Sequence, residues 1–149
     1  MKLKKFKIEN YKRIHPSGSL GISMLQVKDI MHKGNKMPLV KENSKMKSSI
    51  IEMSRKSFGV VGVENNKGKL TGIITDGDLR RNIKKNFLEF SAKEMMTLKP
   101  KLISENELMS NALKIMNKSR ITCLFVFSNK TKTKPIGIIH IHDCLRFVN

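Results

Sequence analysis

The stretch GIITDGDLRR at residues 72–81 recurs, in altered form, as GIIHIHDCLR at residues 137–146. Both copies open with Gly-Ile-Ile and place an aspartate six residues after the glycine. An apolar run that ends in polar turn formers predicts a strand followed by a short helix. The chain therefore carries the same strand–helix unit twice, and this duplication decides the fold.

Matching residues extend the repeat over most of the chain. Five pairs of identical residues are 65 positions apart: Met31 and Met96, Gly72 and Gly137, Ile74 and Ile139, Asp78 and Asp143, and Arg81 and Arg146. Four pairs between the first two of these are 63 positions apart: Glu42 and Glu105, Asn43 and Asn106, Met53 and Met116, and Val63 and Val126. The change of two falls in a polar loop, ENNKGKLTG in the first copy and FSNKTKTKPIG in the second. Because loops tolerate insertions, we interpret the chain as a duplicated unit.

Each copy is expected to have the order β-α-β-β-α. Short strands are predicted at residues 37–40 and 101–104, and the first copy should contain a hairpin of strands 59–63 and 69–75 around a turn at 65–68. Each long helix has apolar residues at positions i, i+4 and i+7: Met46, Ile50 and Met53 in the first copy, and Met109, Leu113 and Met116 in the second. We interpret this stripe as core packing. A unit of this size cannot bury its apolar face alone, so the two copies should pack on each other.

Helix boundaries are predicted from capping residues. The predicted caps have short polar side chains or the spacing of a capping box: Asn43 or Ser44 before the first long helix, and Ser104 with Glu107 before the second. The short helix after the first hairpin is expected to run over residues 76–86, with Leu79 and Ile83 facing inward.

The composition is that of a globular protein without a membrane segment. Hydrophobic residues make up 39% of the chain, and the mean hydropathy is −0.33. No apolar run approaches the roughly 18 residues of a membrane span, and no apolar segment of a secretory signal comes after the basic residues 1–13. Cys123 and Cys144 lack a C-x-x-C spacing, and we interpret them as buried free thiols of a reducing cytoplasm. We therefore expect a cytoplasmic protein.

The net charge of +18 raises the question of nucleic-acid binding. The basic residues are 24 lysines and only 6 arginines, and the lysines are scattered along the whole chain. Base recognition favours arginine, and single-strand binding interleaves aromatic residues with basic ones. Trp is absent and Tyr occurs once. We interpret the charge as a solvated lysine surface, which makes nucleic acid an unlikely partner.

Two units that close with the pattern Gly-aliphatic-aliphatic-Thr-x-x-Asp, with His140 in place of the threonine in the second, resemble a tandem pair of CBS (cystathionine-β-synthase-type) domains over residues 25–149. The resemblance implies an α+β fold in which two β-α-β-β-α repeats pack as a pseudo-twofold pair, a Bateman-type module. The expected boundaries are a connector at residues 1–24, a first repeat at 25–90 and a second repeat at 91–149. The resemblance also implies a homodimer, whose contacts should come from the helices around residues 45–57, 78–86, 107–118 and 143–148.

A narrower resemblance rests on four sequence segments: VKDIMHKG at residues 27–34, GIITDGDLRR, HIHDCLR, and a connector FKIENYKRIHPSGSLG at residues 6–21. These segments are similar to the C-terminal part of the D-arabinose-5-phosphate isomerases, which make the precursor of 3-deoxy-D-manno-octulosonate (Kdo) for lipopolysaccharide. In that family a sugar-isomerase (SIS) domain precedes the connector and the CBS pair. The 149 residues match only the connector and the CBS pair, without the SIS domain, so by themselves they are expected to be inactive.

The duplicated strand–helix junction is the candidate ligand site. At residues 75–78 unpaired backbone N–H groups would favour a phosphate, Thr75 would add a hydroxyl donor, and Asp78 could accept hydrogen bonds from two ribose hydroxyls. Asp143 repeats this arrangement, but His140 stands in place of the threonine. The alternative is that both aspartates only cap helices. The CBS resemblance implies a nucleotide effector, adenosine- or cytidine-type, although His140 argues against plain AMP or ATP at the second site.

The histidines raise two further questions. His140 and His142 could point the same way from a strand end, but no third ligand has a suitable spacing, so we expect no metal. His15 lies in the connector, and the isomerase resemblance implies that this histidine reaches into an isomerase active site.

The sequence supports two hypotheses of different classes. The first is a regulatory CBS pair that binds a nucleotide or nucleotide-sugar effector. The second is a separately encoded chain that completes the active site of an SIS domain or chain through His15.

Overall fold

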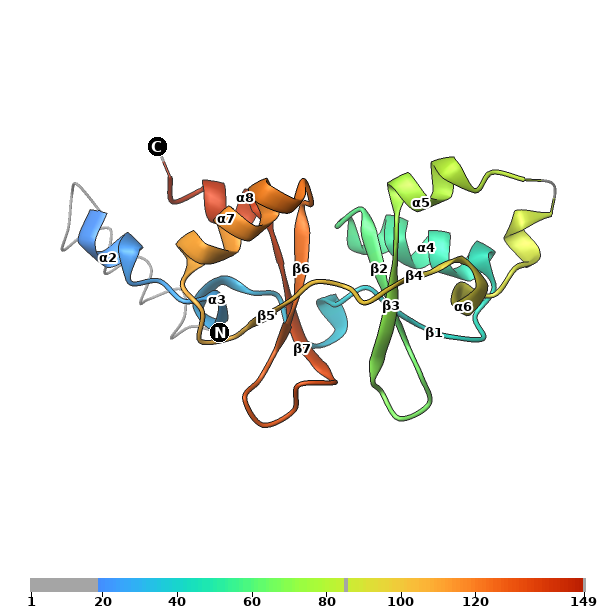
Figure 1. The fold of residues 1–149 in the computed structure, drawn as a ribbon, viewed down its shortest axis with the longest axis horizontal. Coiled ribbons are helices and arrows are strands. Elements are labelled where there is room, and N and C mark those ends of the chain that lie inside the picture. The colour runs from blue at the N-terminus through green and yellow to red at the C-terminus, as the bar shows by residue number, and fades with distance from the viewer. Residues whose placement is uncertain (1–18, 85, 149) are drawn as a thin grey trace.

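A computed structural model describes residues 19–84 and 86–148 of the chain. Two small mixed sheets lie side by side, and helices cover them (Figure 1). The first sheet has the order β1-β2-β3-β4, formed by β1 (Leu39–Lys41), β2 (Val60–Glu64), β3 (Leu70–Thr75) and β4 (Thr97–Leu98). The second has the order β5-β6-β7, formed by β5 (Leu102–Ser104), β6 (Cys123–Phe127) and β7 (Pro135–His140).

The two sheets share one topology. In each, a short strand runs parallel to the first strand of an antiparallel hairpin: β1 to β2, and β5 to β6. Both hairpins even change register at the same place, after Val63 in the first and after Val126 in the second. The predicted turn at residues 65–68 is confirmed, with Gly68 at a φ of +79°, a conformation that glycine adopts without strain. These features confirm the predicted α+β fold of two β-α-β-β-α repeats.

Two long and two short helices lie along the same side of the sheets (Figure 1). Their bounds are α4 (Met46–Lys56), α5 (Asp76–Arg81), α7 (Met109–Ser119) and α8 (Ile141–Leu145). The predicted core stripe is confirmed at its ends, because both methionines of each long helix are buried. Ser57 and Arg120 end the long helices in the left-handed conformation, again 63 positions apart.

The predicted caps of the long helices are wrong. Lys45 and Leu108 occupy the N-cap positions, and neither side chain makes a capping hydrogen bond. The first amides are satisfied instead by carbonyl groups from distant segments: Met46 N donates to Phe90 O at 2.8 Å, and Met109 N donates to Leu25 O at 2.9 Å. Tertiary contacts here replace the local cap that the sequence pattern favoured.

Helix α5 is shorter than predicted, and Ile83 does not face inward. The side-chain amide of Asn82 donates to Asp78 O at 2.8 Å and ends the helix after Arg81. Beyond that point the chain leaves the core, and Ile83 is 68% exposed. Leu79 packs against the buried core as predicted.

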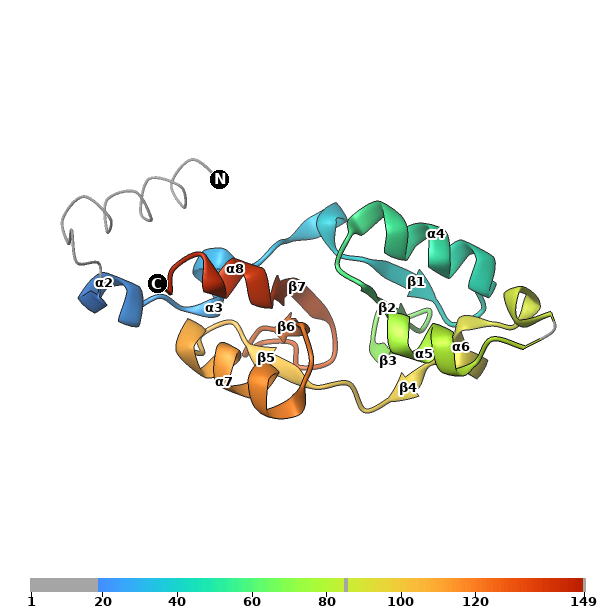
Figure 2. The ribbon, with the colours of Figure 1, turned by 90° about the horizontal axis from the view of Figure 1, so that it is seen from above.

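The repeats exchange their leading segments. Helix α3 (Val27–Ile30) packs into the core beneath the second sheet, and helix α6 (Ala92–Met95) packs into the core beneath the first. Figure 1 and Figure 2 both show α3 on the side of the second sheet and α6 on the side of the first. Strand β4 adds to β3, and the bridge between His32 and Ile138 makes the equivalent contact on β7. A segment that precedes one repeat in sequence therefore completes the other repeat in space.

This exchange explains why each Gly-Ile-Ile strand needs its glycine. A Cβ on Gly72 would lie 2.5 Å from Met96 Sδ and 2.9 Å from the carbonyl of Thr97. A Cβ on Gly137 would lie 2.6 Å from Met31 Sδ and 2.9 Å from the carbonyl of His32. The incoming segments pack on bare backbone, where no other residue fits without displacing them.

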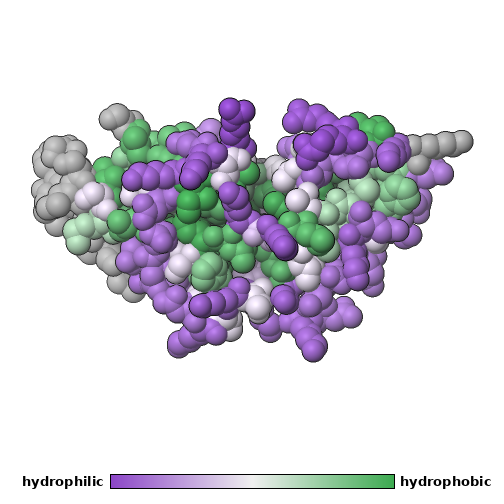
Figure 3. Space-filling view, viewed as in Figure 1, coloured by the Kyte–Doolittle hydropathy of each residue, from purple (hydrophilic) through white to green (hydrophobic). Residues whose placement is uncertain are grey.

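A third cluster of buried residues joins the two sheets: Val60, Leu70, Phe125 and Ile138. Next to this cluster, Leu70 N donates to Thr133 O at 2.9 Å and Cys123 Sγ donates to the carbonyl of Phe58 at 3.3 Å. Hydrophilic residues cover the outer ends of both hairpins, and hydrophobic ones gather over the middle of the face seen in Figure 3. The remaining short elements are α2 (Ser19–Ser23), η1 (Gly34–Lys36) and η2 (Phe87–Glu89).

Candidate functional site

The duplicated aspartates stand where β3 and β7 pass into the short helices α5 and α8. Asp78 and Asp143 are each only 6% exposed, although carboxylates are seldom buried without partners. Each closes a capping box with the last residue of its strand. The geometry of the two sites is therefore set by the same strand-to-helix turn.

In the first site, hydroxyl groups surround the carboxylate. Asp78 Oδ2 accepts hydrogen bonds from Thr75 N at 2.9 Å and from Thr75 Oγ1 at 3.1 Å. Asp78 Oδ1 accepts from Arg81 Nη2 at 2.7 Å and from Thr97 Oγ1 at 3.1 Å. Thr75 Oγ1 also accepts from Asp78 N at 3.2 Å, which caps the helix. Both oxygens of Asp78 are thus fully hydrogen-bonded.

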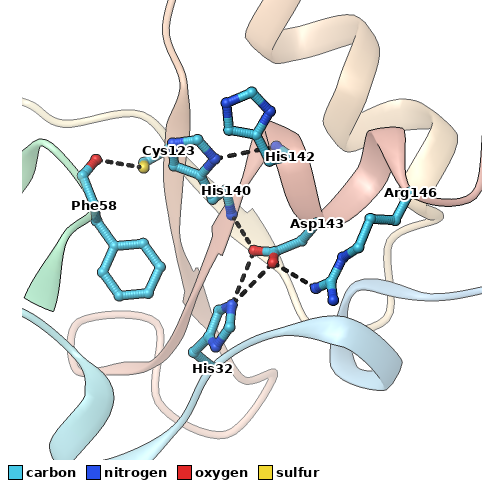
Figure 4. Close-up of polar contacts among 7 residues, drawn as sticks. All are labelled: His32, Phe58, Cys123, His140, His142, Asp143 and Arg146. Carbon is cyan, nitrogen blue, oxygen red and sulfur yellow. Dashed lines mark hydrogen bonds and ion pairs between the residues drawn. The ribbon is translucent and has the colours of Figure 1, made fainter.

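In the second site, imidazole rings take the places of both hydroxyls (Figure 4). His32 Nε2 lies 3.0 Å from each oxygen of Asp143. Arg146 Nη2 donates to Oδ1 at 2.9 Å, and His140 N donates to Oδ2 at 2.8 Å. His140 Nδ1 accepts from His142 N at 3.0 Å and so caps α8, as Thr75 caps α5.

Four residues of these sites, Arg81, Arg146, His32 and Thr97, had no role assigned from the sequence pattern. Arg81 and Arg146 belong to the matched pairs of the repeat, but nothing in their spacing alone pointed to an ion pair with the aspartates. His32 comes from the exchanged segment, 111 residues away from Asp143 in sequence. Its counterpart is Thr97, because these two residues come directly after the paired methionines Met31 and Met96. That pairing was the signal that could have placed them.

The pKa of Asp143 is lowered by its partners. Burial acts to raise the pKa, but the hydrogen bonds from His32 and from His140 N, together with the charge of Arg146, outweigh it. The carboxylate is therefore ionised at neutral pH and acts as a fixed negative charge at the start of α8.

His140 and His142 do lie together, as their spacing suggested. Their rings stack with centroids 4.8 Å apart. Burial lowers the pKa of His140, His142 and His32 lower it further, and Asp143 acts in the opposite direction. Among residues 19–84 and 86–148, no group of three or more His, Cys, Asp and Glu side chains is arranged to hold a metal ion.

Cys123 and Cys144 are free thiols within the fold, as predicted. Burial raises the pKa of Cys123 to about 12 and that of Cys144 to about 11, with Asp143 acting in the same direction on both. Neither thiol is therefore ionised near neutral pH, and both act as packing groups.

The expected unpaired amides at residues 75–78 are largely occupied. Thr75 N and Asp78 N take part in the capping box, and Asp76 N donates to Gly59 O at 3.3 Å. The local turn therefore uses the groups that a phosphate was expected to find. The predicted catalytic residue His15 lies outside the described residues.

A shallow pocket of about 220 Å³ adjoins the first site. It is lined by Asn82, Lys84, Phe90, Glu94 and Met95. Asn82 links the pocket to the site, because its side chain is bonded to the backbone of Asp78.

No helix within the described part of the chain has the length and apolar character needed to cross a membrane.

Comparisons with known proteins identify the repeated unit. The family model described as "CBS domain" matches twice, at residues 27–85 and 92–149. Arabinose 5-phosphate isomerase KdsD of Francisella tularensis is 38% identical over 150 residues, which cover 98% of this chain and 45% of that protein. KdsD of Pseudomonas aeruginosa is 35% identical over 144 residues, which cover 95% and 44%. The chain thus spans slightly less than half the length of these relatives.

Solved structures share the fold. CBSX2 in complex with AMP superposes with a TM-score of 0.68 at 20% identity, covering 81% of this chain and 93% of that one. The CBS domain pair of protein MJ0100, in complex with 5′-methylthioadenosine and S-adenosyl-L-methionine, superposes with a TM-score of 0.71 at 23% identity, covering 83% and 94%.

Proposed function

Because the chain belongs to the CBS-domain family and carries two copies of the domain in tandem, we propose that it binds a nucleotide effector and regulates an arabinose-5-phosphate isomerase-type protein. The observation that carries this proposal is the duplicated pair of a buried aspartate and an exposed arginine. Asp78 with Arg81 and Asp143 with Arg146 hold the same geometry at two strand ends.

Each pair is built so that one carboxylate oxygen can change partners. The inner oxygen of each aspartate is fixed by a backbone amide, whereas the outer oxygen is bonded to an arginine whose side chain is about 70% exposed: 70% for Arg81 and 69% for Arg146. Because solvent screens the exposed guanidinium, each pair contributes only about 0–1 kcal/mol, and the arginine can swing away at little cost. The outer oxygen would then accept ribose hydroxyls, and the guanidinium would bind a phosphate.

The adenosine and cytidine nucleotides are the proposed class of effector. AMP, 5′-methylthioadenosine and S-adenosyl-L-methionine are bound by structural neighbours of this fold, which supports an adenosine-type ligand. The pocket beside Asn82 offers room next to the first site. We assign Thr75, Asp78, His140 and Asp143 as ligand-binding residues on this basis.

The regulated partner is proposed from the similarity to KdsD. The similarity covers nearly the whole of this chain but less than half of each relative. We infer that the CBS pair acts on an SIS isomerase domain and changes its activity when the effector binds. A homodimer is the proposed assembly, supported by exposed apolar side chains along the helical side: Ile51 at 52%, Leu108 at 37% and Leu145 at 42%.

Calorimetric titration of the purified chain with AMP, ATP and CMP at pH 7.5 tests the ligand. Asp78→Ala and Asp143→Ala should each weaken binding at their own site by about 5- to 150-fold, corresponding to about 1–3 kcal/mol for bonds to a charged acceptor. Asp76→Ala is the matched control, because it removes an exposed acidic group from the same helix start. If wild type binds a nucleotide and neither aspartate variant weakens it, the assignment of the site is wrong.

Light scattering tests the assembly. The chain should be dimeric at concentrations on the order of tens of micromolar, where functional dimers persist. Ile51→Lys should give a monomer by placing a charge within the helical face, while Leu98→Lys, on the exposed strand β4, should leave the dimer intact. A monomeric wild type would contradict the proposed homodimer.

A further inference from the structure

All three histidines of the described residues meet at the second site. His32 bonds to Asp143, and the rings of His140 and His142 stack on each other. The ring of Phe58, from the first repeat, packs edge-on against His32 with centroids 5.1 Å apart (Figure 4). In the first site the counterparts of His140 and His32 are Thr75 and Thr97, which do not titrate near neutral pH, and the counterpart of His142 is Gly77.

The hydrogen bond that caps α8 requires a neutral ring. His140 Nδ1 accepts the amide hydrogen of His142 at 3.0 Å, and a ring nitrogen can accept only when it carries no proton. The hydrogen of the neutral imidazole must then sit on Nε2. Protonation would place an N–H on Nδ1, facing the N–H of His142, and the capping bond would be lost.

We propose that His140 is a proton-sensitive cap: its neutral ring holds the first turn of α8, and protonation releases that turn. The second site then responds to mild acid, whereas the first site, capped by the hydroxyl of Thr75, does not. The switch itself rests on contacts within the ligand-free chain. Its extension to effector binding rests on the proposed function.

The groups around His140 support this assignment. The titratable and charged side chains that face it, directly or through Asp143, are His142 and Asp143 of α8, Arg146 just beyond α8, His32 of the exchanged segment and Cys123 of β6. The Cys123 thiol stays neutral, since its pKa is raised to about 12, mainly by burial. Asp143 and Arg146 form a pair of opposite charges that does not change near neutral pH.

The three imidazoles differ in what a proton does to them. His32 Nε2 is directed at the Asp143 carboxylate and not at the capping bond. A proton on His142 leaves its backbone N–H free to donate as before. A proton on His140 removes an acceptor, and burial together with the two neighbouring imidazoles lowers the pKa of this ring. Protonation of His140 is thus the event that opens the cap.

Nitrogen NMR of the wild-type imidazoles tests the proposal without any variant. At pH 8 the His140 ring should carry its hydrogen on Nε2, with Nδ1 unprotonated. As the pH falls below the ordinary histidine value of about 6.5, the ring should protonate, and the His142 amide should exchange with solvent roughly two- to thirtyfold faster, after correction for intrinsic rates, than with the cap intact. A hydrogen on Nδ1 at pH 8, or an amide whose corrected exchange does not change, would overturn the proposal.

Two variants separate the ring of His140 from its neighbour. His140→Thr installs the cap of the first site and should abolish the acid response of the α8 amides. His142→Gln keeps the backbone donor and should retain the response. An acid response that survives His140→Thr shows that another group drives it, and the proposal fails. Because these experiments use no ligand, a chain that binds no nucleotide can still show the switch, and the calorimetric titration at pH 7.5 can succeed when the switch fails.

Discussion

The two aspartate sites of this molecule have the same frame and different chemistry. Asp78 accepts hydrogen bonds from the hydroxyls of Thr75 and Thr97, whereas Asp143 is bonded to the imidazole of His32 and to the backbone amide of His140. Glycine, aspartate and arginine are identical in the two copies and fix the geometry of the turn. The two substituted positions determine which groups can donate, accept or titrate.

The difference teaches that duplication conserves packing more strictly than polar character. At the glycines there is no room for a Cβ, which would lie 2.5 or 2.6 Å from a methionine sulfur and 2.9 Å from a backbone carbonyl. At the threonine and histidine positions the side chains are partly or fully exposed, and either residue type can donate a hydrogen bond to the aspartate. Substitution between the two copies is therefore tolerated at these solvent-accessible positions and not at the buried glycines.

The largest effect is expected where the two repeats are alike. Gly72→Val and Gly137→Val should each lower the free energy of unfolding by about 3 kcal/mol, at the upper end of the usual cost of overpacking. The added carbons would overlap Met96 Sδ or Met31 Sδ and a fixed backbone carbonyl. Urea denaturation of both variants should show losses of similar size.

Gly77→Ala is the control for this comparison. A Cβ there would lie 3.2 Å from the flexible end of Arg81 and at an ordinary contact distance of 3.6 Å from Thr75 Oγ1, and alanine favours a helix over glycine. This variant should be neutral or more stable than wild type by up to about 1 kcal/mol. If one valine variant is tolerated while the other unfolds, the exchanged segments do not pack equivalently.

A smaller effect should distinguish the sites. Asp143→Asn should cost about 2 kcal/mol and Asp78→Asn about 1 kcal/mol, within the range for bonds to a charged acceptor. Threonine hydroxyls can turn to accept from the new amide, whereas His32 must change its ring proton to do so. Asp76→Asn, at an exposed position, should change stability little. Equal losses at 78 and 143, measured by urea denaturation at pH 7.5, would remove the distinction between the sites.

The sequence predicted most of the fold because both copies keep the same spacing of apolar residues. The Met46 and Met53 stripe, the hairpin turn at residues 65–68 and the β-α-β-β-α order are all consequences of local spacing. The predicted caps, Asn43 or Ser44 in the first copy and Ser104 in the second, were wrong because distant carbonyls satisfy the helix amides. Exchange of the leading segments could not be inferred from spacing, since it depends on which surface each segment finds in space.

The site was predicted in part for the same reason. Each aspartate lies within one turn of its capping residue, Asp78 with Thr75 and Asp143 with His140, and the structure places each pair together at the end of its strand. His32 reaches its partner only through the exchange, so its contact with Asp143 lay beyond local patterns. The assignment of Thr75, Asp78, His140 and Asp143 as ligand-binding residues stays a prediction.

A weaker effect on the free energy of unfolding is expected at acidic pH. The folded Asp143 has a pKa below its ordinary value of 3.8, because hydrogen bonds and the Arg146 charge outweigh burial. The folded state therefore binds fewer protons than the unfolded state between these values, and stability falls as the pH drops through them. Asp143 stabilises the fold above about pH 5, and this contribution is lost progressively below it. The stability gap between wild type and Asp143→Asn should thus narrow from pH 6 to pH 3; a gap that stays constant would show that the carboxylate charge contributes nothing.

The smallest effect on stability should come from the arginines, and it sharpens the comparison most. Arg81→Ala and Arg146→Ala each remove one bond to an aspartate from a side chain about 70% exposed: 70% for Arg81 and 69% for Arg146. Such pairs contribute about 0–1 kcal/mol, because solvent screens the charges and the long side chain loses entropy when it is held. At the second site His32 still bonds both oxygens of Asp143, so the loss there should be the smaller of the two.

Thermal unfolding at low and high salt measures both losses, and the difference between wild type and each variant should shrink in high salt. A loss well above 1 kcal/mol would mean that the arginine is a structural clamp, unable to leave the aspartate for a phosphate. The proposed exchange of partners at the outer oxygen would then be excluded at that site.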